Sequence, residues 1–168
     1  AKTVCITSLE PLRRGGQCAG TSVSVCAAPF LLASHGTLAP GLHNALGMLA
    51  GEGREDILSL GLENGTGADE FAGKLKLILA GVTKEDEILL LADLVGGSPL
   101  TTAANVIAEL DLIDRTVMIG GMNLPLALSA VLMKDSMELS ELKEMLLPEA
   151  REELKEFTVV KENEEDEI

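Results

Sequence analysis

One run of residues limits the possible folds of this chain more than any other. The segment 87–93 reads Glu-Ile-Leu-Leu-Leu-Ala-Asp, in which an uninterrupted apolar stretch follows one acid and ends in another. A strand with one face in water alternates apolar and polar residues, whereas a parallel strand covered on both faces reads as a continuous apolar run. The segment therefore predicts a central strand of a parallel sheet that is buried on both sides.

Strand and helix patterns alternate along the chain from residue 29. Besides 87–93, four short segments have the composition of strands, namely 30–34, 56–62, 116–120 and 157–161. Apolar residues at the spacing of one helix face predict helices at 40–50, 69–79, 99–110, 124–133 and 140–154. This alternation predicts an α/β fold with a doubly wound, mostly parallel sheet and helices on both faces. Its simplest strand order is 2-1-3-4.

Composition excludes several classes of function. The net charge of −14 argues against binding of duplex nucleic acid, which needs a basic face, and an aromatic content of 2% argues against stacking on single strands. No apolar run approaches the roughly 20 residues that span a bilayer. The three cysteines, Cys5, Cys18 and Cys26, lack the paired spacing of a zinc site. A chain without further cysteines fits a reducing cytosol. We therefore expect an acidic cytoplasmic protein with no nucleic-acid partner and no metal.

Charge also divides the chain into segments. The first 29 residues carry three bases and one acid, a net charge of +2, so the remaining 139 residues carry −16. We expect residues 1–28 to be an extension that is either flexible or not native to the protein, and we favour the second interpretation. The domain is expected at 29–161, and an acidic tail at 162–168.

A histidine and an aspartate follow the first and third predicted strands. His35 lies where the first strand ends, and Asp93 closes the apolar run. In the order 2-1-3-4 these strands are neighbours whose helices leave on opposite sides, which makes a switch point where open α/β sheets bind ligands. We therefore expect His35 and Asp93 to meet there. A carboxylate that accepts the Nδ1–H leaves the Nε2 lone pair outward, as a nucleophile or a general base.

Two loops beside this pair offer N–H groups to an anion. Gly36 and Thr37 precede the first helix, and Gly97 and Ser98 precede the third. Free N–H groups at a helix start attract phosphate, and glycine lets the backbone approach a ligand closely. This pattern favours a phosphoryl group over an acyl oxyanion without excluding the second. A third loop contains Asn123, which either caps the following helix or touches ligand.

Three segments resemble a known family. They are Leu-Ala-Ser-His-Gly-Thr-Leu-Ala-Pro-Gly-Leu at 32–42, Leu-Ala-Asp-Leu-Val-Gly-Gly-Ser-Pro at 91–99 and Gly-Gly-Met-Asn-Leu-Pro at 120–125. In order and spacing they are similar to the enzyme IIA components of the mannose/fructose/sorbose family. These components belong to the bacterial phosphoenolpyruvate-dependent sugar phosphotransferase system. The resemblance covers residues 29–150.

The resemblance implies a function and partners. It implies that His35 accepts a phosphoryl group from the histidine-containing phosphocarrier protein and passes it to a histidine of a IIB component. Asp93 then orients the imidazole. The implied protein is a phosphotransferase with a phosphohistidine intermediate and no cofactor, linked indirectly to the membrane components IIC and IID. It is also a homodimer with an added antiparallel strand, for which 157–161 is the candidate. Because no IIB-like segment follows in this sequence, we expect the IIB partner to be another chain.

Three other functions stay open. One is a non-transporting regulatory IIA-like module, and another is the phosphotransfer subunit of dihydroxyacetone kinase. Gly36 after the histidine and the Gly-Gly-Ser-Pro loop fit the sugar system better than that kinase. A hydrolase with the His35–Asp93 pair as general base needs a separate nucleophile or a metal, and Ser98 has no second histidine beside it. We interpret the other histidine, His43, as a partly exposed helix residue rather than a catalytic partner.

Overall fold

The computed structural model describes residues 29–159 of the chain. The predicted extension 1–28 and the predicted tail 162–168 lie outside the described residues, as do the last two residues of the domain expected at 29–161. Within residues 29–159, no helix has both the length and the apolar character needed to cross a bilayer.

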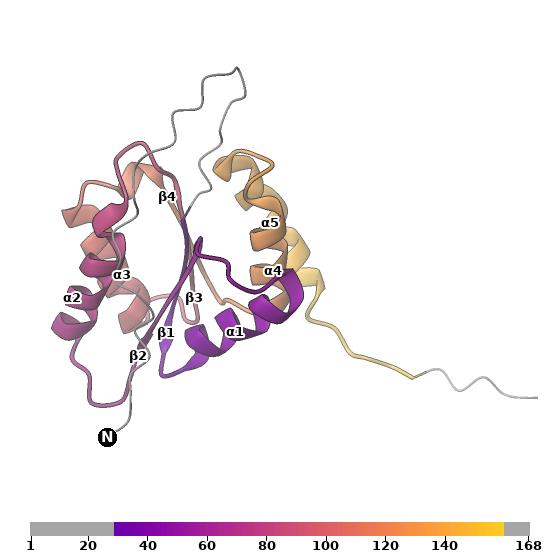
Figure 1. Ribbon diagram of the computed structural model, residues 1–168. Helices are drawn as coiled ribbons and strands as arrows, with labels where there is room; N and C mark the ends of the chain where they lie inside the picture. The colour runs from indigo at the N-terminus through magenta and orange to yellow at the C-terminus, as the bar shows by residue number, and fades with distance from the viewer. Residues whose placement is uncertain (1–28, 160–168) are drawn as a thin grey trace, which may run out of the picture.

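A four-stranded parallel sheet lies between two layers of helices (Figure 1). Its strands are β1 (Phe30–His35), β2 (Ile57–Leu62), β3 (Ile88–Ala92) and β4 (Thr116–Gly120). The helices are α1 (Leu38–Ala50), α2 (Ala68–Ile78), α3 (Ser98–Glu109), α4 (Leu124–Met133) and α5 (Leu139–Glu152), with short 3₁₀ turns η1 (Leu79–Gly81) and η2 (Ile113–Arg115). The strand order is β2-β1-β3-β4, and every neighbouring pair is parallel. The predicted doubly wound fold and its strand order are confirmed.

The antiparallel strand expected at 157–161 is not shown. Phe157–Val159 have no strand structure, and the last two residues of that segment lie outside the described residues. The described sheet is therefore parallel throughout.

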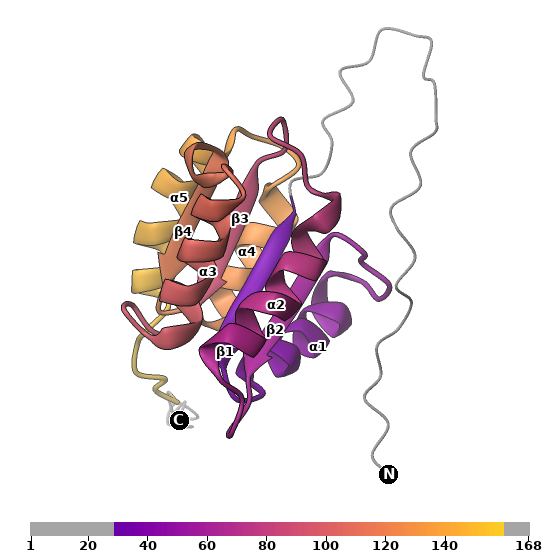
Figure 2. The ribbon, with the colours of Figure 1, turned by 90° about the vertical axis from the view of Figure 1, so that its left-hand side faces the viewer.

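Each face of the sheet has its own apolar core. One core lies between the sheet and α1, α4 and α5, and the other lies between the sheet and α2 and α3. Within β3, Leu89 and Leu91 belong to the first core. Ile88 and Leu90 belong to the second. Figure 2, seen from the side of α2 and α3, shows these two helices covering their face of the sheet. Burial on both faces explains why the run 87–93 contains no polar alternation.

The switch point forms between β1 and β3. These strands pair side by side, with Phe30 opposite Leu89 and Ala33 opposite Ala92. The helix after β1 packs in the first core, whereas the helix after β3 packs in the second. The two chain segments therefore separate at the carboxyl ends of β1 and β3, which leaves the ends of both strands open to a ligand or partner.

A buried lysine forms ion pairs at the opposite, amino end of the sheet. The side chain of Lys134, just after α4, is fully buried, and its Nζ lies 2.9 Å from Asp56 Oδ2 and 2.7 Å from Asp135 Oδ1. Arg54 also donates two hydrogen bonds to the Asp56 carboxylate. The Arg54 guanidinium, and then the Lys134 ammonium, hold the pKa of Asp56 far below its usual range against the opposing effect of burial. The Asp56 carbonyl accepts from the N–H of Phe30, so this cluster fixes the start of β1.

Candidate functional site

His35 and Asp93 are in direct contact at the carboxyl edge of the sheet. His35 is the last residue of β1, and Asp93 follows β3 directly. Asp93 Oδ2 accepts the backbone N–H of His35 at 2.8 Å and lies 3.0 Å from the imidazole Nδ1. The histidine side chain is 47% exposed, whereas the aspartate side chain is only 13% exposed. The predicted meeting of these two residues is confirmed.

This geometry leaves one imidazole nitrogen for chemistry. With Asp93 ionised, Nδ1 carries the hydrogen and Nε2 carries the outward lone pair. Among the described residues, none forms a hydrogen bond with Nε2. Both interactions use Oδ2 of Asp93, while its buried Oδ1 accepts no hydrogen bond from the described part of the chain. The position of the imidazole therefore depends on a single carboxylate oxygen.

The loop from β1 to α1 is held by its own backbone. Gly36 has φ +54°, in the left-handed region that glycine adopts at little cost, and its N–H donates to the Leu62 carbonyl at 2.8 Å. Buried Ser34 accepts the N–H of Ala39 at 2.7 Å and so caps the first turn of α1. The amide of Gly36 was expected to hold a phosphoryl group, but it is already bonded to Leu62. Within residues 29–159, the N–H of Thr37 has no such partner.

The loop from β3 to α3 follows the same pattern. Gly97 donates its N–H to the Leu94 carbonyl at 3.1 Å, which closes a four-residue turn. Gly96 has φ +76° at the third position of that turn, where a type II turn favours glycine. The amide of Gly97 is therefore engaged as well. The N–H of Ser98, at the start of α3, has no acceptor among the described residues and stays available to an anion.

Two other predicted polar residues act within the fold. Asn123 accepts the N–H of Leu126 at 2.9 Å, so it caps α4, the first of the two roles considered for it. His43, on α1, places its Nδ1 3.0 Å from Ser59 Oγ in β2. Burial lowers the pKa of His43, although nearby Asp56 opposes that shift. His43 is therefore a partly exposed residue of α1, as expected, and its ring also contacts β2 through Ser59.

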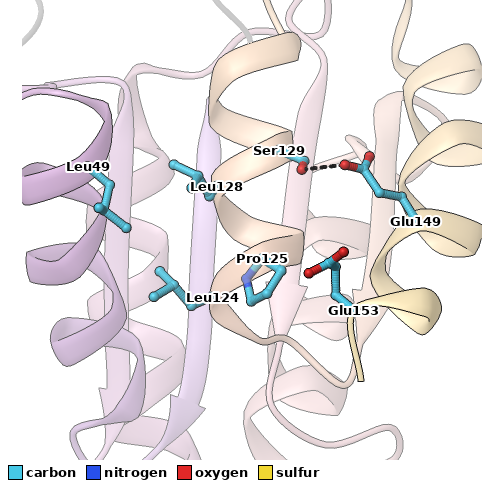
Figure 3. Close-up of a pocket in the computed structure, with 7 residues that line it drawn as sticks. All are labelled: Leu49, Leu124, Pro125, Leu128, Ser129, Glu149 and Glu153. Carbon is cyan, nitrogen blue, oxygen red and sulfur yellow. Dashed lines mark hydrogen bonds between the residues drawn. The ribbon is translucent and has the colours of Figure 1, made fainter. Parts of the chain in front are cut away.

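A hollow on another face offers less chemistry. It lies between α1, α4 and α5, has a volume of about 370 Å³, and is lined by Leu49, Leu124, Pro125, Leu128, Ser129, Glu149 and Glu153 (Figure 3). Ser129 donates to the Glu149 carboxylate, and the lining contains no histidine. Within residues 29–159, no group of three or more potential ligands among His, Cys, Asp and Glu is placed to hold a metal. The candidate site is therefore the His35–Asp93 pair.

One glycine allows the His35 loop to adopt its position and is not identified by the sequence pattern alone. Gly61, in β2, lies opposite Ser34, and a Cβ at this position would be 2.0 Å from the Gly36 carbonyl oxygen. Only a residue without a side chain allows the loop to lie there. A glycine inside a strand is a known sign of close backbone approach, so the signal was present, but the sequence does not say which segment approaches.

Fold and site together define a class of protein. It is a doubly wound α/β protein that holds a half-exposed histidine against a largely buried carboxylate at the switch point, with helix N-termini beside it.

Comparison with known proteins names the family. The family described as PTS system fructose IIA component, where PTS is the phosphotransferase system, matches residues 29–147. The PTS system fructose-specific EIIA component of Bacillus subtilis (strain 168) is 30% identical over 112 residues, which are 67% of this chain and 74% of that protein. The chain therefore belongs to the fructose IIA component family of the PTS.

Solved structures agree on the fold. The mannose/sorbose-specific IIA subunit from Enterococcus faecalis matches with a TM-score of 0.70 at 23% identity, covering 81% of this chain and 98% of that one. The PTS IIA protein associated with the fucose utilization operon of Streptococcus pneumoniae has a TM-score of 0.61 at 28% identity, covering 76% and 96%. Family membership assigns the chain a general role in sugar phosphotransfer, with phosphocarrier and IIB components as its general partners.

Proposed function

We propose that this chain is a cytoplasmic phosphocarrier whose His35 Nε2 accepts a phosphoryl group from the histidine-containing phosphocarrier protein and passes it to a IIB component. The observation that carries this proposal is the contact between His35 Nδ1 and Asp93 Oδ2 at 3.0 Å, which leaves Nε2 free at an exposed strand end. The family supports phosphotransfer in general.

The proposed step is an in-line displacement. The Nε2 lone pair of His35 forms a bond to phosphorus while the N–P bond to the donor's imidazole breaks, and its electron pair returns to that imidazole. The hydrogen on Nδ1 stays in place, so the product ring gains positive charge. Asp93 stabilises that charge at hydrogen-bond distance. Such transfers depend mainly on positioning and on charge stabilisation.

The phosphoryl oxygens are proposed to face the two helix starts beside the histidine. Thr37 and Ser98 have amides without an acceptor among residues 29–159, and the Ser98 hydroxyl adds a further donor. Gly36 and Gly97, whose amides are engaged, shape the loops instead. The arrangement thus offers donors from both sides of the switch point.

Exposed apolar side chains around the site favour a protein as the phosphoryl donor. Leu38 follows the His35 loop, and Leu94 and Val95 lie in the turn before Gly97; all three are more than half exposed. Exposed apolar residues of this kind mark surfaces that other proteins cover. A small phosphorylated metabolite would gain little from them. Partner docking over His35 is therefore part of the proposal.

Intact-mass measurement tests this function. The full chain is incubated with phosphoenolpyruvate, enzyme I and the phosphocarrier protein, beside the variants His35→Ala and His43→Gln. The proposal predicts one acid-labile phosphate on the wild type and on His43→Gln, and none on His35→Ala. Phosphate on folded His35→Ala, or none on folded wild type, overturns it. The second outcome would instead favour the non-transporting regulatory module.

We further propose that the chain is a homodimer. Leu154, Phe157 and Val159 follow α5 as apolar residues that are each more than three-quarters exposed, and β4 is an edge strand of the described sheet. A second copy covers such residues at low cost. Light scattering coupled to gel filtration is expected to give twice the chain mass for the wild type and a shift toward the monomer for Phe157→Ser. A monomeric wild type overturns the dimer.

A further inference from the structure

The His35 imidazole packs against a glycine that its backbone conformation does not require. Gly97 has φ −69° and ψ 156°, which any residue adopts. A Cβ at this position would nevertheless lie 2.8 Å from His35 Cε1, well inside the 3.5–4.0 Å at which carbon atoms normally pack. Because Cε1 joins the two ring nitrogens, a side chain at residue 97 would push on the reacting edge of the imidazole. Gly97 is therefore needed for space.

A second glycine lets the turn that contains Gly97 lie close against the end of β4. Gly120, the last residue of β4, lies opposite Ala92, which directly precedes Asp93. A Cβ at Gly120 would lie 2.3 Å from Val95 Cγ2, and 3.1 and 3.2 Å from the Val95 N and Cα atoms. Rotation of the Val95 side chain relieves only the first of these contacts. The remaining two require the turn itself to move by a few tenths of an ångström.

The two glycines form one line of contact. Gly120 lies against Val95, which is the second residue of the turn Leu94–Gly97. Gly97 is the last residue of that turn and lies against the His35 ring. Asp93, which fixes the imidazole Nδ1, stands directly before this turn. Any shift of the turn therefore reaches the ring of His35 from two sides, through Gly97 and through Asp93.

We propose that Gly120 is a positioning residue for His35, which acts through Val95 and the Leu94–Gly97 turn to set the orientation of the imidazole. The inference deepens the proposed function, since it matters for phosphoryl transfer only if His35 is the acceptor. Its structural content does not depend on that role, because it concerns where the ring sits in the unmodified chain.

Nitrogen-15 NMR of the histidine rings tests the proposal without any transfer reaction. The chain has only two histidines, so the His43 ring serves as an internal reference. In the wild type, His35 is expected as the Nδ1–H tautomer. Gly120→Ala is expected to shift the His35 ring signals and its tautomer ratio while those of His43 stay in place. The variants are Gly120→Ala, Val95→Ala, the pair combined, and Gly97→Ala.

The combined variant separates positioning from general damage. Val95→Ala removes Cγ2, the atom of the closest contact, but keeps the Val95 N and Cα atoms, so it is expected to return the His35 signals of Gly120→Ala only part of the way to wild type. Gly73→Ala in α2 is the matched control, because its Cβ meets nothing within 4 Å. If Gly120→Ala does not fold, the His35 ring signals are measured in the combined variant and in Gly97→Ala. Gly97→Ala is expected to shift these signals directly, because its Cβ would contact the ring. Unchanged His35 signals in folded Gly120→Ala, or a shift that Val95→Ala does not reduce at all, overturn the proposal.

Transfer kinetics provide a separate readout. A displacement of the reacting group by about 1 Å costs on the order of 10²-fold in rate, so Gly97→Ala is expected to lose about that factor and Gly120→Ala about tenfold. If wild type takes up no phosphate, the proposed function fails while the NMR result still decides the positioning role. If wild type is phosphorylated but both glycine variants transfer at the wild-type rate, the positioning inference fails alone.

Discussion

The buried ion cluster at the amino end of the sheet gives a prediction that depends on which partner is removed. Lys134 is fully buried between Asp56 and Asp135, whereas Asp56 keeps two hydrogen bonds from Arg54 when the lysine is absent. Asp56→Ala therefore leaves a buried ammonium with one half-exposed carboxylate. Lys134→Met leaves a carboxylate that is still paired. The two substitutions break the same ion pair with unequal consequences.

The expected magnitudes follow from burial. Leaving a buried charge without its main partner costs about 3–5 kcal/mol, and this range applies to Asp56→Ala. Replacing the ammonium by an apolar side chain of similar length removes its desolvation penalty as well as its attraction, so Lys134→Met is expected to cost only about 1–2 kcal/mol. In the combined variant neither charge is left unpaired in the interior, so its cost is expected to fall below that of Asp56→Ala alone.

Urea unfolding at neutral pH, followed by circular dichroism, measures these three free energies. The change in the free energy of unfolding as the pH falls below neutral gives an independent check. Because the folded pKa of Asp56 is lowered, its contribution to stability is present above its unfolded pKa and is lost as the pH falls through the lower folded value. Asp56→Ala is expected to lack this loss. A cost for Lys134→Met equal to or above that of Asp56→Ala, or strictly additive costs in the combined variant, would show that the buried ammonium does not depend on Asp56.

Three further results are expected. Asp93→Asn keeps an oxygen that can accept the His35 N–H, so it should fold. It loses the charge beside Nδ1 and should slow phosphoryl uptake by about 10²-fold in a rapid-quench assay. Uptake at the wild-type rate would show that the His35–Asp93 pair is not needed for transfer. Gly61→Ala pushes a Cβ against the Gly36 carbonyl and should lose about 1–3 kcal/mol of stability in urea, a cost that a neutral result would disprove. Burial lowers the pKa of His43, so its neutral form stabilises the fold above the unfolded pKa of about 6.5, and this contribution is lost as the pH falls below it. His43→Gln should flatten the change in melting temperature between pH 7 and pH 5, and an unchanged slope would contradict this.

The sequence was sufficient for the topology because its strongest signals come from burial on both faces of one sheet. The run around β3 and the helix spacings predicted the strand order, and that order in turn predicted the meeting of His35 and Asp93. Helix starts were less certain. The first helix was expected from residue 40 but begins at Leu38, because the buried Ser34 hydroxyl caps an amide inside the first turn. Local pattern does not reveal a cap that comes from the end of the preceding strand.

Features that depend on three-dimensional contact were not predicted. The amides of Gly36 and Gly97 looked free in the sequence, yet each is bonded to a carbonyl that only the folded loop brings near. Gly61 and Gly120 carry no special backbone angle, and their role becomes visible only when the neighbouring loop is in place. Lys134 reads as an ordinary exposed lysine until the cluster with Asp56 is assembled.

The position of phosphorus on the phosphorylated chain tests the proposed role of His35 Nε2 without relying on any variant. Nitrogen-15 and phosphorus-31 NMR on the wild type, phosphorylated through the phosphocarrier protein, identify which ring nitrogen bears the group. Because Asp93 occupies Nδ1 of His35, we expect phosphorus on Nε2 of His35 and an unmodified His43 ring. Phosphorus on Nδ1 of His35, or on His43, would exclude His35 Nε2 as the phosphoryl acceptor.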